Sequence, residues 1–255
     1  MLLIHAPLYL APPSTNRIRE HIHARRLGAI LTPSSGNRVP EEGYWAADSG
    51  IFGNSYVGDE AYMDWLEERV EFADRCLFAT APDVPFNAFA TISHSYPYLD
   101  RIRRLGYPVA LVAQDHLEFC DWWRWEDFDC LFIGGSTAWK LSPAAAVLAR
   151  AACAAGLWVH VGRVNSFKRL RYAAAAMDAD SADGTLLANG PDKHLPSVLR
   201  WTWQLLLEEA PSLIDACRLV HDPYDGRYSL ASGRTVTTAP RIPAAFYDSV
   251  QLTLL

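Results

Sequence analysis

The chain has 255 residues, of which 50% are hydrophobic, 12% are aromatic and 20% are charged. This composition is typical of a globular protein and excludes disordered, collagen-like and coiled-coil chains. The formal net charge of −6 argues against a protein that coats nucleic acid through bulk electrostatics, although a local basic patch remains compatible with it.

Membrane and secretory segments are not expected. No stretch approaches the roughly 18 consecutive apolar residues of a membrane-spanning helix. The start, Met-Leu-Leu-Ile, lacks the basic segment and long apolar run of a signal peptide. The five cysteines are scattered and never reach CxxC spacing, which favours free thiols in a reducing compartment. The sequence therefore predicts a cytoplasmic protein.

Short apolar runs alternate with longer segments of helical periodicity. The runs predict eight strands, at residues 2–5, 29–31, 45–47, 76–80, 109–113, 130–133, 157–161 and 179–182. A helix is predicted after Gly58, with Asp59 as its N-cap. Its apolar face is formed by residues at helical spacing, namely Met63, Leu66, Val70 and Ala73. Three further helices are predicted, from Ser142-Pro143 to Gly156, from Ser166 to Ala176, and from Pro191 or Lys193 to Leu207.

Strands that alternate with helices predict a parallel sheet. We expect a single α/β domain, a (β/α)8 TIM-type barrel, over residues 1–210, with residues 211–255 as an extension packed on it. A hairpin is expected near Ser232-Gly233 within that extension. The alternative is an open doubly wound sheet, but no GxGxxG motif follows the first predicted strand.

Working residues of such barrels lie at the carboxyl ends of the strands. Three predicted strands are each followed by a carboxylate, at Asp48, Asp83 and the pair Asp180 and Asp183. Carboxylates gathered at one mouth would shift one another's pKa, which suits nucleophilic and acid–base chemistry. Gln114 follows a fourth strand.

Two other kinds of site are weighed. Asp178, Asp180 and Asp183 offer oxygen ligands to a hard cation, but their spacing departs from calcium loops, so no metal is predicted. Gly134, Gly135 and Ser136 form a turn that suits either a phosphate group or the close approach of a flat ligand. No GxSxG elbow supports serine hydrolysis.

The ordered motifs resemble the tRNA-guanine transglycosylase superfamily, most closely its short phage and bacterial members that insert 7-deazaguanines into DNA. The segments that carry the resemblance are Ala47-Asp48-Ser49-Gly50-Ile51-Phe52, Leu111-Val112-Ala113-Gln114, Phe132-Ile133-Gly134-Gly135-Ser136, His160-Val161-Gly162 and Asp178-Ala179-Asp180-Ser181-Ala182-Asp183. They span roughly residues 44 to 190 in the family's order.

The resemblance implies exchange of guanine for a 7-deazaguanine, such as the 7-cyano form, without a cofactor. Asp183 would be the nucleophile and Asp48 the general acid–base, as retaining exchange requires two carboxylates. Phe52 would stack on the base, and Asp83 would accept from its N1–H and amine. The remaining implied substrate-binding residues are Gln114, Gly134, Gly135, Ser136, Gly162 and Asp180.

Departures from the family favour DNA over tRNA as the polymer. The zinc-binding insertion of the tRNA enzymes has no counterpart here, and Thr185-Leu186-Leu187-Ala188 stands where their arginines follow the nucleophile. Asp178 and Ile51 replace glycines of the family motifs, and Gly53 replaces a glutamine. If a phage encodes the chain, its compartment is the host cytoplasm, and partner proteins of a DNA-modification system are expected.

A basic rim is expected to hold the DNA backbone, with Arg163, Lys168, Arg169 and Arg171 as candidates. The tryptophans of Trp122-Trp123-Arg124-Trp125 are expected either to stack on an unpaired strand or to pack a helix on the barrel. Three alternatives stay open: tRNA-directed exchange, a metal-dependent barrel hydrolase, and a non-catalytic subunit that binds deazaguanine or DNA.

Overall fold

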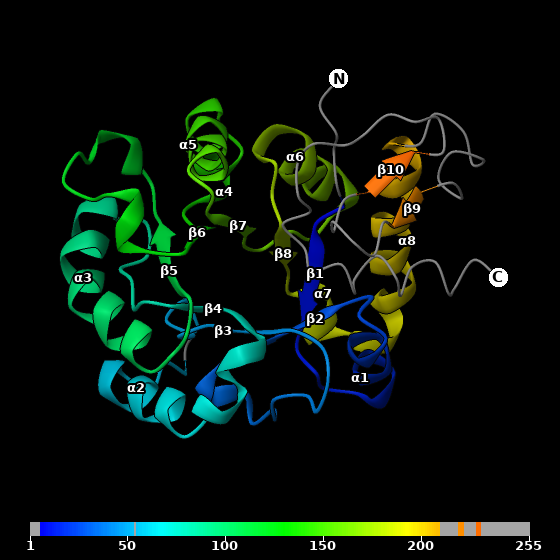
Figure 1. Cartoon of the computed structure of the whole chain (residues 1–255), viewed down its shortest axis with the longest axis horizontal. Coiled ribbons are helices and arrows are strands. Elements are labelled where there is room, and N and C mark those ends of the chain that lie inside the picture. The colour runs from blue at the N-terminus through cyan, green and yellow to red at the C-terminus, as the bar shows by residue number, and fades with distance from the viewer. Residues whose placement is uncertain (1–5, 54, 210–218, 222–227, 231–255) are drawn as a thin grey trace.

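A closed barrel of eight parallel strands forms the centre of the molecule (Figure 1). The computed structural model describes residues 6–53, 55–209, 219–221 and 228–230. The strands are β1 (Leu8–Ala11), β2 (Gly28–Leu31), β3 (Trp45–Ala47), β4 (Cys76–Thr80), β5 (Val109–Ala113), β6 (Cys130–Ile133), β7 (Trp158–Val161) and β8 (Ser181–Asp183). The predicted (β/α)8 barrel is confirmed, and the open sheet is excluded.

The barrel closes where β8 pairs with β1. Leu8 lies opposite Ser181, and Leu10 lies opposite Asp183. The first strand of the barrel is β1 at Leu8–Ala11, whereas the sequence predicted a strand at residues 2–5, which lie outside the described part of the chain. β1 is buried along its length and pairs with β2 on one side and β8 on the other, as a parallel barrel strand must.

Helices surround the strands, as Figure 1 shows. They are α1 (Asn16–His23), α2 (Asp59–Glu67), α3 (Ala88–Arg104), α4 (Thr137–Lys140), α5 (Pro143–Ala154), α6 (Phe167–Met177), α7 (Leu186–Asn189) and α8 (Pro191–Glu209). Short 3-10 turns lie at Pro33–Ser35, Val70–Arg75, Leu117–Phe119 and Trp125–Asp127.

Side-chain caps set several helix starts. The hydroxyl of Ser142 accepts from Ala145 N at the start of α5, and that of Ser166 accepts from Arg169 N at the start of α6. Both starts were predicted, because serine oxygens satisfy amide groups that the first turn leaves without partners.

Helix α2 is shorter than its periodicity predicts. It ends at Glu67, and Val70 and Ala73 belong to a following 3-10 turn, in which Val70 is exposed. Gly58 rather than Asp59 is the N-cap, and Asp59 is the first helical residue.

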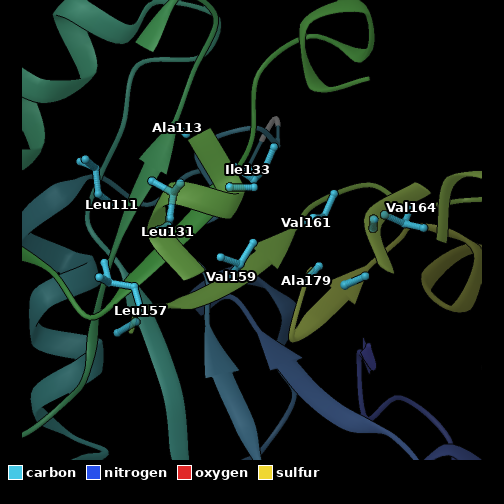
Figure 2. Close-up of a cluster of buried hydrophobic side chains, with 14 of the residues drawn as sticks. Leu111, Ala113, Leu131, Ile133, Leu157, Val159, Val161, Val164 and Ala179 are labelled. Carbon is cyan, nitrogen blue, oxygen red and sulfur yellow. The ribbon is translucent and has the colours of Figure 1, made fainter. Parts of the chain in front are cut away.

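Residues alternate between two faces along every barrel strand. One face packs against the helices; Figure 2 shows part of this layer, with Leu131 of β6 beside Val159 and Val161 of β7. The other face fills the barrel with a separate cluster that includes Leu8, Leu10 and Phe78. Side chains at the last inward position of each strand therefore reach the carboxyl end of the barrel.

The described part of the C-terminal region holds a two-stranded antiparallel sheet of β9 (Leu219–His221) and β10 (Tyr228–Leu230). The hairpin predicted near Ser232-Gly233 lies outside the described residues, and the division of the chain at residue 210 remains a prediction. Within the described ranges, no helix is long and apolar enough to cross a membrane. Cys76, Cys120, Cys130 and Cys153 are buried free thiols, as expected.

Candidate functional site

A pocket of about 490 Å³, partly open to solvent, lies at the carboxyl ends of the strands. It is lined by Asp48, Ile51, Phe52, Thr80, Asp83, Val112, Gln114, Phe132, Gly134, Gly135, Gly162, Arg163 and Asp183. Nine of the fourteen residues predicted for the site thus meet in one pocket, although they come from segments up to 135 positions apart in the sequence. This is the end of the barrel at which the strand pattern places functional residues.

Asp183 is the last residue of β8, and its side chain is 19% exposed. Its Oδ1 accepts a hydrogen bond from the backbone N–H of Arg163 at 3.1 Å and lies 3.2 Å from Nε2 of His160. Among the described residues, the structure gives no hydrogen bond to Oδ2. One carboxylate oxygen is thus anchored, and the other is available to a ligand.

Asp48 follows β3, and its Oδ1 accepts from the backbone N–H of Gly50 at 2.7 Å. Burial raises the pKa of Asp48 to about 6; the Gly50 hydrogen bond opposes this shift, and the charge of Asp183 adds to it. A carboxyl group with a pKa near neutrality can both give and take a proton at physiological pH.

Asp83 and Gln114 form a buried pair on the floor of the pocket. Gln114 Nε2 donates to Asp83 Oδ2 at 2.5 Å, and its Oε1 accepts from the backbone N–H groups of Phe86 and Gly135. Burial raises the pKa of Asp83 to about 7, the Asp48 charge adds to the rise, and the Gln114 hydrogen bond opposes it.

These contacts change the roles predicted for Gln114 and Gly135. The oxygen of Gln114 and the N–H of Gly135 bond to each other, so neither faces a ligand unpaired. Their pairing instead orients the amide whose nitrogen holds Asp83. Gln114 therefore fixes the carboxylate of Asp83, which lines the pocket.

At two glycines in the pocket lining, any side chain would collide with its neighbours. Gly135 has φ +65°, a left-handed conformation, and an added Cβ would lie 2.5 Å from Oδ1 of Asp115. At Gly162 an added Cβ would lie 2.7 Å from the ring of Phe132. The backbone therefore forms the pocket wall at both positions.

An aromatic and cationic group lies at the pocket mouth. Phe52 is 53% exposed, and its ring contacts the ring of Phe86 edge to face at 5.5 Å between centroids. Arg163 has φ +60°, and its guanidinium donates to the carbonyl oxygen of Gly135. Arg163 was predicted only as a DNA contact, but it lines the pocket itself.

Two of the predicted site residues, Ser136 and Asp180, are not among the residues that line the pocket. Ser136 is the N-cap of α4, and its hydroxyl accepts from Trp139 N at 3.2 Å. Asp180 precedes β8 and accepts from the backbone N–H of Val159 at 2.7 Å, at the opposite end of the strand from Asp183. Successive strand residues alternate between faces, so positions three apart cannot share one.

The predicted basic rim divides into two parts. Lys168 and Arg171 of α6 are exposed. Arg169 instead lines a second, smaller cavity of about 280 Å³ together with Arg163, Lys140 and Tyr172.

Sequence reasoning missed Lys140 and Phe86 and did not assign a role to His160. Lys140 ends α4, is 5% exposed and donates to the carbonyl oxygen of Gly162; burial, with the charge of Arg163, lowers its pKa to about 7. Lys140 lies in a helix rather than directly after a strand, so no strand-end pattern marks it. His160 lies inside an apolar strand, where a lone polar residue was the available signal.

The predicted tryptophan cluster is a loop with a 3-10 turn rather than a helix. Trp123 and Trp125 contact each other at 4.6 Å between ring centroids, and both pack near Phe128. Only Trp122 of the three is largely exposed.

The aspartates weighed as metal ligands are separated in the structure. Asp178 is the left-handed C-cap of α6, and Asp180 and Asp183 lie at opposite ends of β8. Across the described ranges, no group of three or more His, Cys, Asp or Glu side chains could hold a metal ion.

Comparison with known proteins finds similarity to solved structures at low sequence identity. The sequence matches no protein-family model and no curated protein. One solved structure, "QR15, an Aldolase", is 13% identical with a TM-score of 0.43 and covers 78% of this chain and 99% of its own. The Bacillus subtilis YkuI protein, with an EAL domain in complex with c-di-GMP and calcium, is 15% identical with a TM-score of 0.36, over 76% of this chain and 47% of its own. The strand topology and the pocket lining themselves define the chain as an eight-stranded α/β barrel with a carboxylate-lined pocket.

Proposed function

We propose that the chain is a guanine transglycosylase that acts on nucleic acid, with DNA as the polymer and a 7-deazaguanine, such as the 7-cyano form, as the incoming base. The observation that carries the proposal is the meeting of Asp48, Asp83 and Asp183 in one pocket under the ring of Phe52. A base-exchange site needs a nucleophile, a proton carrier, an acceptor for the base edge and a stacking surface.

In the first half of the reaction, Oδ2 of Asp183 attacks C1′ of the target guanosine. The bond between C1′ and N9 breaks, its electron pair stays with guanine, and Asp48 supplies the proton that the leaving base needs. A pKa of about 6 lets Asp48 exist in both protonation states near neutral pH. The product is a covalent glycosyl-enzyme and free guanine.

In the second half, Asp48 takes the N9 proton of the incoming deazaguanine, and that nitrogen attacks C1′. The bond from C1′ to Oδ2 breaks, and its electron pair returns to Asp183. Two displacements give net retention at C1′. The ionised carboxylate of Asp83 accepts from the N1–H and exocyclic amine that guanine and deazaguanines share, which rejects bases lacking those donors.

The target nucleotide must leave the base stack before C1′ can reach a pocket at the barrel mouth. Exposed Lys168 and Arg171 of α6, the helix that follows β7, would then hold the DNA backbone. A net charge of −6 disfavours general binding to DNA. A partner protein that opens the duplex and presents the target nucleotide would therefore assist the reaction.

The test is nucleoside mass spectrometry on DNA and tRNA, digested separately, from cells that make 7-cyano-7-deazaguanine and express the chain. Asp183→Ala and Asp183→Asn should abolish the modified nucleoside in DNA, and Asp183→Glu should reduce it strongly because the attacking oxygen is displaced. The matched control is Asp178→Asn, at a helix cap outside the pocket, which should modify DNA normally.

Each other outcome has a distinct meaning. Modification of tRNA alone would move the activity to the other polymer. Modification that survives Asp183→Ala would overturn the covalent mechanism. Deazaguanine binding by the purified chain, without any covalent adduct or modified nucleoside, would make it a binding subunit.

A further inference from the structure

His160 is a fully buried histidine for which the reaction above has no use. It lies on β7 opposite Ser181 of β8 and points into the barrel. Its ring packs against those of Phe78 and Phe132, at 4.9 Å and 4.4 Å between centroids. The two phenylalanines hold the imidazole in one orientation and keep water from its faces.

A chain of hydrogen bonds runs through this imidazole to the nucleophile. Nε1 of Trp158 lies 2.8 Å from Oγ of Ser181, and that Oγ lies 2.8 Å from Nδ1 of His160. At the other side of the ring, Nε2 lies 3.2 Å from Oδ1 of Asp183. Trp158 and His160 are both inward residues of β7, and Ser181 and Asp183 are both inward residues of β8.

Donor and acceptor chemistry fixes the direction of every bond in this chain. The indole N–H of Trp158 can only donate, so Oγ of Ser181 accepts it. An ionised carboxylate can only accept, so Nε2 of His160 must carry a proton toward Asp183. Burial lowers the pKa of His160; the hydrogen bond and charge of Asp183 oppose this shift without reversing it, so the neutral ring is favoured. A neutral ring with its proton on Nε2 has a bare Nδ1, which accepts the hydroxyl proton of Ser181.

We infer that Trp158, Ser181 and His160 are positioning residues. Trp158 and Ser181 hold His160 as its Nε2–H tautomer, and His160 in turn anchors Oδ1 of Asp183. This leaves Oδ2 as the attacking oxygen. This inference deepens the proposed function and rests on it for its kinetic consequences. The backbone N–H of Arg163 also donates to Oδ1 and therefore helps to anchor the same oxygen.

The anchor affects the two halves of the reaction differently. A hydrogen bond to Oδ1 is stronger when Asp183 is a free carboxylate than when it is an ester of C1′. It therefore restrains the attack on C1′ slightly and assists the second half, in which the bond between C1′ and Oδ2 breaks and the electron pair returns to the carboxylate. Loss of the donor should therefore slow breakdown of the glycosyl-enzyme without slowing its formation.

A pair of matched variants separates this role from packing. In His160→Gln, the amide nitrogen can reach the place of Nε2 and still donate to Asp183. In His160→Asn, the shorter amide reaches only the place of Nδ1. We expect His160→Asn to slow breakdown about 10- to 100-fold, the cost of a lost charge-assisted hydrogen bond, so that the adduct accumulates. His160→Gln should restore most of the rate.

Rapid-quench measurement of adduct formation, and of its discharge by deazaguanine, gives the two rates. The positioning role would be overturned if formation and breakdown of the adduct slowed equally. It would also be overturned if His160→Gln and His160→Asn slowed breakdown to the same extent. Trp158→Phe removes only the first donor of the chain and provides a milder variant; the same selective slowing of breakdown is expected, with a smaller effect.

Nitrogen-15 NMR of the histidine rings tests the chain without any reaction. The wild-type protein near pH 7 should show His160 neutral with its proton on Nε2, and Ser181→Ala should lose this preference. A ring protonated on Nδ1, or on both nitrogens, would refute the chain even if exchange occurs. An Nε2–H ring in a protein that forms no adduct would instead refute the proposed function alone.

Discussion

The guanidinium of Arg163 lies over the ring of Phe52, with its Cζ 4.1 Å from the ring centroid. Phe52 follows β3 and Arg163 follows β7, and these strands are four apart in a closed barrel of eight, on opposite sides. The pair therefore spans the pocket mouth. A flat base that enters the pocket must pass or displace this stack, and it finds both an aromatic face and a planar cation as it does so.

Removal of the Phe52 ring should weaken base binding more than chemistry. In Phe52→Ala we expect the KM for the incoming deazaguanine to rise about tenfold or more, the effect of one lost stacking contact, with a smaller change in kcat. Steady-state exchange with labelled base measures both. The control is Phe89→Ala, because Phe89 is as exposed as Phe52 but does not line the pocket. A kcat loss with unchanged KM would contradict the stacking role.

The ionised carboxylate of Asp83 should lower the free energy of unfolding near and above neutral pH. Its folded-state pKa of about 7 exceeds its ordinary value of 3.8, so the folded state holds its proton more tightly than the unfolded state does. Stability is therefore lost as pH rises between these values, and the full cost is present above about pH 7. We expect Asp83→Asn to be more stable than wild type at about pH 8, by on the order of 4 kcal/mol, and nearly equal to it at about pH 4.

Urea unfolding at the two pH values measures this difference. The asparagine keeps an oxygen for the Gln114 amide, so a loss of stability at both pH values would show that the carboxylate is a favourable partner instead. The same variant should lose exchange activity, since the amide offers one acceptor oxygen and one repulsive donor group to the base.

Asp48 should give opposite pH dependences to the two half-reactions. Adduct formation requires its protonated form and should fall as pH rises through about 6, whereas discharge by deazaguanine requires its ionised form and should rise over the same range. Single-turnover rates at saturating base measure each limb. Asp48→Asn should slow both half-reactions and remove both pH dependences. A pH dependence that persists in this variant would belong to another titrating group.

DNA binding should depend on salt through the exposed cations of α6. Lys168→Ala and Arg171→Ala should each weaken binding and reduce the slope of log affinity against log salt by about one if each contacts a phosphate. Arg104→Ala provides the control, because Arg104 is exposed at the end of α3, on the other side of the barrel from the pocket. Equal effects at Arg104 would mean that the protein binds DNA without using this rim.

The sequence predicted most pocket residues because a parallel barrel has simple geometry. Every strand ends at the same rim, so a polar residue that follows an apolar run can be assigned to one mouth, as for Asp48 and Gln114. The strand was expected at residues 179–182, whereas β8 begins at Ser181 and ends at Asp183. Because its start lies two residues later than expected, Asp180 precedes the strand and lies at the other end of the barrel from Asp183.

Contacts between distant segments lay beyond the sequence. Lys140 reaches Gly162 through a tertiary contact, and no local pattern marks a helix-ending lysine as buried. The bond between Gln114 and Gly135 depends on the packing of β5 against β6. Helix α3 was not among the predicted helices, and Pro97 lies inside it, where proline ordinarily argues against a helix.

The pairing of β8 with β1 makes the position of Asp183, the proposed nucleophile, depend on the whole chain. Asp183 lies opposite Leu10, at the seam where the two ends of the barrel meet. Ser181 and Asp183 face inward together, so a slip of β8 by one residue would replace both with outward neighbours such as Ala182. The Asp183 carboxylate and its supporting chain are thus assembled only once the ring of strands is complete, and under the proposed function catalytic competence would be a direct measure of correct barrel closure.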